Sequence, residues 1–211
     1  FEENGTAYII MEFIEGKSLK AYLKERGGIL SVDETLSLME PVIKALAVIH
    51  EKGIVHRDIS PDNIMLTNDE NVKLIDFGAA RVQASTEDKT YTVILKHGYA
   101  PVEQYYAKGN LGAWTDVYSI CATMYKMLTG QTPPNSIERM ESDKYMPPSA
   151  LGISVSPRTE QVLYKGLAIR CEDRYQSVSQ MLGDLYGNQA VTSNTVAVSA
   201  NNALYYSDIQ N

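Results

Sequence analysis

Cysteine is scarce in this sequence, which excludes the disulfide-rich and zinc-binding classes of small domain. Among 211 residues only Cys121 and Cys171 occur, and neither has a second cysteine or a histidine at metal-ligand spacing. Two isolated cysteines are typical of reduced thiols in the cytosol. We therefore expect a cytoplasmic protein, and a Cys121–Cys171 disulfide remains the alternative.

Long apolar runs and an excess of positive charge are also missing. No run reaches the roughly 18 apolar residues of a membrane span, and no signal-peptide pattern opens the chain. Acidic residues outnumber basic ones by 26 to 19, which argues against nucleic acid as a partner. The hydrophobic content of 44% is enough for one domain with a sizeable core.

The pattern of apolar residues predicts a few short strands early in the chain. Residues 79–97 are polar and lack periodicity, which predicts a long functional loop. After Gly187 the composition changes, and residues 188–211 are expected to form a linker or flexible tail. The predicted strands are residues 8–13, 54–55, 64–66 and 72–75.

Serine residues at capping positions mark most of the predicted helices. Pro41 lies inside the second helix and is expected to bend it. Residues 1–187 are therefore expected to form one lobe, mainly α with a small β ribbon and α+β overall. The predicted helices are residues 19–26, 32–51 and 114–129, with two more that begin after Ser156 and Ser177.

Three short segments carry the residues that suggest chemistry: residues 56–63 (HRDISPDN), 76–78 (DFG) and 98–103 (GYAPVE). Phosphoryl transfer asks a protein mainly to position groups and to neutralise charge around a triphosphate. Asp58 suits the carboxylate that orients an attacking hydroxyl and accepts its proton. Asn63 and Asp76 suit Mg²⁺, which prefers hard oxygen ligands. The alternative is that the three residues only cap turns.

In this order, the segments resemble the signatures of protein kinases. From about residue 5 to residue 187, the sequence resembles the C-terminal lobe of a bacterial-type serine/threonine protein kinase. The resemblance implies transfer of the γ-phosphate of ATP, with Mg²⁺, to protein substrates. It also implies that an N-lobe, missing here, completes the ATP site, so we expect this lobe alone to be weak or inactive. The uncovered apolar face around Met65 and Phe77 is expected to favour self-association.

The resemblance also assigns roles to residues outside the catalytic centre. Tyr118 and Cys121 stand where the family usually has Trp and Gly. The implied roles are the gatekeeper (Met11), adenine binding (the backbone of Glu12 and Ile14, with Met65 beneath the ring), the regulatory stack and its glycine (His56, Phe77 and Gly78), the anchor of the catalytic loop (Asp116) and a buried ion pair (Glu103 with Arg174).

Ser60 and Lys96 depart from the family pattern. Related kinases commonly carry lysine two residues after the catalytic aspartate and threonine three residues before the tyrosine at position 99. Here a serine and a lysine occupy these positions, as if the cation and the hydroxyl had changed places. We hypothesise that Lys96 supplies the cation that neutralises the γ-phosphate. The alternative is a solvated loop lysine.

Arg57 precedes the catalytic aspartate, where the family uses an arginine to receive a phosphate from the activation loop. Thr90 and Thr92 are the candidate phosphorylation sites, and an unmodified polar loop is the alternative. Two other functions remain open: a non-catalytic pseudokinase or scaffold module, and a small-molecule kinase of the aminoglycoside type. The metal-site residues argue against the first, and the segment around Glu103 argues against the second.

Overall fold

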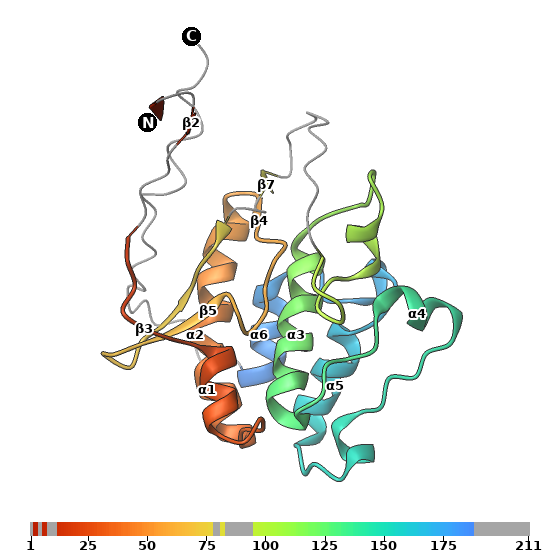
Figure 1. Ribbon diagram of the computed structural model, residues 1–211. Helices are drawn as coiled ribbons and strands as arrows, with labels where there is room; N and C mark the ends of the chain where they lie inside the picture. The colour runs from red at the N-terminus through yellow and green to blue at the C-terminus, as the bar shows by residue number, and fades with distance from the viewer. Residues whose placement is uncertain (1, 4–5, 8–11, 78–80, 83–94, 188–211) are drawn as a thin grey trace.

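The computed structural model describes residues 2–3, 6–7, 12–77, 81–82 and 95–187 (Figure 1). The predictions for Met11, Gly78, Thr90, Thr92 and the tail 188–211 lie outside these residues. The strands are β1 (Glu2–Glu3), β2 (Thr6–Ala7), β3 (Gly16–Ser18), β4 (Ile54–Val55), β5 (Ile64–Thr67), β6 (Val72–Leu74) and β7 (Arg81–Val82). The helices are α1 (Leu19–Glu25), α2 (Val32–Glu51), α3 (Ala113–Thr129), α4 (Ser136–Glu141), α5 (Pro157–Gly166) and α6 (Val178–Tyr186), with 3-10 turns η2 (Val102–Tyr105), η3 (Pro148–Leu151) and η4 (Cys171–Asp173).

The core forms around α3, which three other helices surround. α2, α5 and α6 all contact it, and Figure 1 shows α2 and α5 on either side of α3 with α6 behind them. From Thr115 to Thr129, α3 is buried apart from Lys126, and polar side chains such as those of Asp116 and Ser119 are among the buried ones. The helix ends at Gly130, whose φ of 70° is a left-handed conformation that glycine adopts readily.

Local capping explains where the other helices begin. The hydroxyls of Ser18, Ser31, Ser156 and Ser177 each accept a hydrogen bond from a backbone N–H in the first turn of the helix that follows. These contacts satisfy donors that a helix N-terminus otherwise leaves unpaired. The predicted starts of these four helices are therefore confirmed. α2 continues through Pro41 to Glu51.

The small sheet has the order β3–β5–β6, and both strand pairs are antiparallel. Sequence reasoning missed β3, because residues 16–18 (GKS) include no apolar side chain that would predict a strand. A Cβ at Gly16 would lie 2.2 Å from the carbonyl oxygen of Leu66 in β5, so glycine is what permits this close pairing. The predicted strand 8–13 is wrong at residues 12–13, which are not in a strand, and its other residues are not described.

Two further predictions can be compared with the described residues. The long loop expected over residues 79–97 contains a short strand, because β7 pairs with β4. Both cysteines are free, and Cys121 is buried in α3. Burial raises the pKa of the Cys121 thiol to about 12, so this side chain behaves as a small apolar group.

Candidate active site

The loop between β4 and β5 is held against the central helix by Asp116. The backbone N–H groups of His56 and Arg57 donate to the two carboxylate oxygens of Asp116, each at 2.8 Å. His50 on α2 contacts the same carboxylate at 2.7 Å through Nε2. Asp116 is fully buried, so these partners replace the water that its charge would otherwise require. These contacts connect the loop to α3, and the role implied for Asp116 as its anchor stays a prediction.

Asp58 follows the two anchored residues directly, and Asn63 fixes its orientation. The Nδ2 atom of Asn63 donates to the backbone oxygen of Asp58 at 2.7 Å and to its Oδ2 atom at 2.8 Å. Asn63 is 6% exposed, so both bonds lie in a protected position. Because Nδ2 makes both contacts, the Oδ1 atom of Asn63 is left as an acceptor that a cation can use.

The hairpin of β5 and β6 brings Asp76 back beside Asn63. Ile64 pairs with Leu74, and the next residue along, Ile75, donates its N–H to the carbonyl oxygen of Asn63 at 2.9 Å. Asp76 follows Ile75, with a φ of 64° and an exposed side chain. Asp58, Asn63 and Asp76 lie up to 18 positions apart in the printed sequence, but their segments adjoin at one end of the hairpin. Asn63 binds Asp58, and the residue before Asp76 binds the backbone of Asn63.

This set of oxygen atoms fits Mg²⁺ bound together with a triphosphate. Within the described ranges, no three His, Cys, Asp or Glu side chains form a cluster that could hold a metal alone. Mg²⁺ in phosphoryl-transfer sites usually takes one or two protein ligands and completes its shell with phosphate oxygens and water. The amide oxygen of Asn63 and the carboxylate of Asp76 are the residues that would hold such a cation, and this role stays a prediction.

His56 and Phe77, for which the resemblance implies a regulatory stack, contact each other, and the stack itself stays a prediction. Their ring centroids are 4.7 Å apart, in an edge-to-face arrangement. Burial lowers the pKa of His56, although the Asp116 carboxylate and the Ile75 carbonyl oxygen act in the opposite direction. Phe77 remains 39% exposed, as expected for this face.

Lys96 reaches the loop of residues 56–63, called the catalytic loop from here on, from a segment that is distant in the sequence. Its Nζ atom lies 3.0 Å from Oδ1 of Asp58 and donates to Oγ of Ser60 at 2.9 Å. Ser60 is fully buried, and the Lys96 side chain is 30% exposed. The structure thus brings together the two residues that depart from the family pattern, and Lys96 is not simply a solvated lysine.

The residues implied in adenine binding lie along the small sheet. Met65 is half-buried in β5, between Ser18 of β3 and Lys73 of β6. Glu12 is exposed, and its carboxylate pairs with Lys73 at 3.0 Å. Ile14 is half-buried. The role of the backbone of residues 12 and 14 in adenine binding remains a prediction.

A family model described as "Protein kinase domain" matches residues 1–184 of the chain. The chain belongs to the protein kinase family. Among solved structures, one named "PpkA-294 apo form" shares the fold of this kinase-family chain with a TM-score of 0.74 and 33% identity, over 88% of this chain and 65% of that one. The predicted kinase-like fold, mainly α with a small β ribbon, is confirmed.

Three curated relatives of this kinase-family chain come from bacteria. A probable serine/threonine-protein kinase of Clostridium perfringens is 34% identical over 187 residues, covering 84% of this chain and 27% of that protein. The serine/threonine-protein kinase PknB of Mycolicibacterium smegmatis is 34% identical over 84% of this chain and 30% of its own length. PknL of Mycobacterium tuberculosis is 35% identical, over 84% and 46%. The chain thus spans a quarter to a half of these relatives.

Sequence reasoning missed two side chains that support the site. Gln104 of η2 donates to the backbone oxygen of Arg57 at 2.7 Å, which ties the segment after Lys96 to the catalytic loop. His50 binds Asp116 from α2, as described above. His50 lies on a predicted helix six positions before His56, and this was a usable signal, because a polar residue near the end of an otherwise apolar helix face usually has a buried partner. No helix among the described residues is long and apolar enough to cross a bilayer.

Proposed function

We propose that this chain is the catalytic C-terminal lobe of an ATP-dependent protein serine/threonine kinase. The observation that carries the proposal lies at one end of the β5–β6 hairpin. Asn63 binds the Asp58 carboxylate there at 2.8 Å, and Ile75, the neighbour of Asp76, binds the backbone of Asn63 at 2.9 Å. Family membership and the names of the bacterial relatives support the same reaction. The site then acts on a hydroxyl of a protein substrate.

Each residue has a defined task in this proposal. The Asp58 carboxylate orients the substrate hydroxyl and accepts its proton as the oxygen attacks. Asn63 holds Asp58 in place and, with Asp76, would bind Mg²⁺. The metal, when bound with ATP, neutralises charge on the phosphate oxygens. Met65 and the backbone of Glu12 and Ile14 would hold the adenine, with Met11 as gatekeeper.

A protein substrate is favoured over a small molecule by the segment that ends in η2. This segment is fastened to the catalytic loop by Gln104 and to the helical core by Glu103, whose carboxylate binds Arg174. A fixed surface beside the catalytic aspartate suits an extended peptide better than a small free ligand. If the activation loop is phosphorylated at Thr90 or Thr92, Arg57 is the proposed receiver.

Phosphoryl transfer by the whole gene product tests the proposal. We expect labelling of a generic basic protein from γ-labelled ATP, with phosphate on serine or threonine. Asp58→Asn should lower the rate by about 10²- to 10⁴-fold, the usual worth of a general base. Asp69→Asn, at the exposed tip of the same hairpin, is the matched control and should retain the activity. A rate that does not depend on Asp58, or labelling of aminoglycosides but not of protein, contradicts the proposal.

A further inference from the structure

The two oxygens of the Asp58 carboxylate have different partners. Oδ2 accepts a hydrogen bond from Asn63, and Oδ1 lies 3.0 Å from the Lys96 ammonium. We propose that Lys96 is a catalytic residue whose ammonium bridges Asp58 and the γ-phosphate, and that Ser60 is the positioning residue that holds this ammonium. The proposal rests on the proposed kinase function, and it identifies Lys96 as the cation at the site of phosphoryl transfer.

The hydrogen-bonding capacity of Lys96 fits this role. An ammonium group has three N–H donors. One is used by Oγ of Ser60 at 2.9 Å and one by Oδ1 of Asp58. No other described residue is recorded as a partner of the third, which we assign to an oxygen of the transferring phosphate, and the side chain is 30% exposed. Two other lysines near the loop and the hairpin pair with carboxylates other than Asp58: Lys20 pairs with Asp62 and Lys73 with Glu12.

Electrostatics supplies the reason for a cation at this point. The carboxylate that must accept a proton is negative, and so is the phosphate that approaches it. Without a positive group between them they repel each other most strongly in the water-poor environment of a closed site. A preorganised ammonium removes this repulsion without having to reorient during the reaction.

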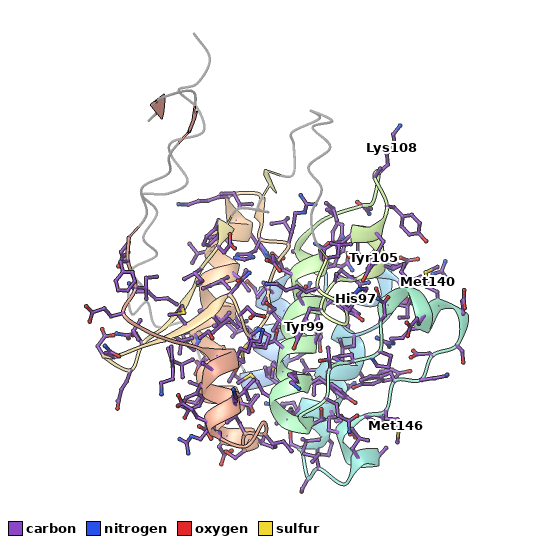
Figure 2. All side chains as sticks on the ribbon, in the orientation of Figure 1. His97, Tyr99, Tyr105, Lys108, Met140 and Met146 are labelled. Carbon is purple, nitrogen blue, oxygen red and sulfur yellow. The ribbon has the colours of Figure 1, made fainter. Side chains whose placement is uncertain are left out.

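The backbone that carries Lys96 is fixed to the helical core. Its carbonyl oxygen accepts hydrogen bonds from the N–H groups of Tyr99 and Ala100, each at 3.1 Å. Ser119 of α3 donates to the carbonyl oxygen of Tyr99, and Ser136 of α4 donates to that of Ala100, both at 2.8 Å. Figure 2 shows Tyr99 next to α3. The turn of residues 96–100 thus places the ammonium by tertiary contacts.

Ser60 completes the arrangement from the side of the catalytic loop. It is fully buried, and its backbone oxygen accepts a hydrogen bond from the N–H of Asn63 at 3.0 Å. Its short side chain leaves room for the lysine that arrives from the other segment. The loop therefore offers an acceptor where a cation is needed, and the turn at residue 96 supplies the cation.

The chemical step balances with Lys96 unchanged. The substrate oxygen forms a bond to the γ-phosphorus, and the bond from this phosphorus to the bridging oxygen breaks to release ADP. The hydroxyl proton passes to Asp58. Lys96 stays protonated throughout and acts by charge and hydrogen bonding alone.

Chemical restoration of the charge tests the proposal in the whole gene product. Lys96→Cys should lower kcat by about 100-fold, the usual worth of one preorganised donor to developing charge. Treatment with 2-bromoethylamine converts the new cysteine into a lysine-like side chain, and we expect kcat to return to within about three-fold of wild type. Iodoacetamide, which adds a neutral group of similar size, should not restore it.

Three controls accompany this test. Treated wild-type protein reports the effect of alkylating Cys171, because Cys121 is buried. Lys108→Cys places the same chemistry at an exposed lysine, which Figure 2 shows at the outer tip of its loop, away from Tyr99, and it should change nothing. Thermal denaturation of treated and untreated Lys96→Cys checks that both are equally folded.

Nucleotide binding gives a readout that does not depend on turnover. If Lys96 contacts the γ-phosphate, Lys96→Cys should weaken binding of a non-hydrolysable triphosphate with Mg²⁺ by about ten-fold relative to ADP. Aminoethylation should restore the ratio. An equal loss of affinity for both nucleotides, or no loss of affinity, contradicts a contact between Lys96 and the γ-phosphate.

Two kinetic outcomes also overturn the inference: a kcat for Lys96→Cys within about two-fold of wild type, and a loss that aminoethylation does not reverse. Failure of the kinase proposal has a different signature, because wild-type protein would then show no transfer that depends on Asp58. The triphosphate-to-diphosphate binding ratio tests Lys96 in either case.

Discussion

The guanidinium of Arg174 binds both carboxylate oxygens of Glu103, at 2.7 Å from Nη1 to Oε1 and at 3.1 Å from Nη2 to Oε2. The Arg174 side chain is fully buried and that of Glu103 is 6% exposed. Thr115 of α3 adds a hydrogen bond to the same carboxylate. Gln104, the neighbour of Glu103, binds the backbone of Arg57. The pair therefore fixes the segment after Lys96 between the helical core and the catalytic loop.

Removal of one partner of this pair should destabilise the fold strongly. We expect Arg174→Ala to lower the free energy of unfolding by about 3–5 kcal/mol, because a buried carboxylate is left without its cation. Arg170→Ala is the matched control, since its ion pair with Glu172 is largely exposed, and it should cost less than about 1 kcal/mol. Urea denaturation measures both, and equal losses would show that burial of the pair is not what matters.

The anchor of the catalytic loop gives a second prediction. Asp116→Ala leaves the N–H groups of His56 and Arg57 without their acceptor. Each unpaired group costs about 1–3 kcal/mol, so we expect a loss of about 2–6 kcal/mol for the two groups. kcat should fall as well, because Asp58 follows directly. Denaturation and steady-state kinetics check this, with the exposed Asp173→Ala as control, and a stable variant with full kcat would be the contrary result.

Gly166 of α5 packs so closely against Cys121 of α3 that the size of one residue limits the size of the other. A Cβ at Gly166 would lie 2.2 Å from the sulfur of Cys121. Gly166→Ala should therefore destabilise the protein by about 1–3 kcal/mol through overpacking, although alanine favours a helix over glycine by about 1 kcal/mol. In a Cys121→Gly background the same substitution should cost nothing. A double-mutant cycle measures this coupling, and simple additivity of the two changes would refute it.

The buried His56 predicts a dependence of stability on pH. Burial lowers its pKa below the ordinary value of 6.5. As pH falls below that value, the unfolded chain takes up a proton that the folded chain does not, so stability falls with decreasing pH from about 6.5 toward the folded pKa. Urea denaturation between about pH 7.5 and pH 5.5 should show a smaller fall for His56→Phe than for wild type. Both proteins keep His50 and His97, so an identical fall would exclude His56 as the cause.

Much of this molecule follows from local patterns. The serine caps at Ser31 and Ser156 act within one helical turn, so they mark helix starts that the structure confirms. The strand at Gly16 was missed for the opposite reason, because it exists only through its pairing with β5. β7 likewise forms against β4, from a stretch whose own composition predicts a loop.

In the candidate active site, too, some features follow from local sequence patterns and others only from tertiary structure. The loop of residues 56–63 and the D-F-G turn at Asp76 are short patterns, and their residue types alone indicated oxygen ligands and a catalytic carboxylate. Which side chains surround that carboxylate is a matter of tertiary structure. Lys96 lies 36 positions from Ser60, and Glu103 lies 71 positions from Arg174. Only the packing of the intervening chain on α3 brings such residues together, because contacts over these separations depend on the whole fold rather than on any local preference.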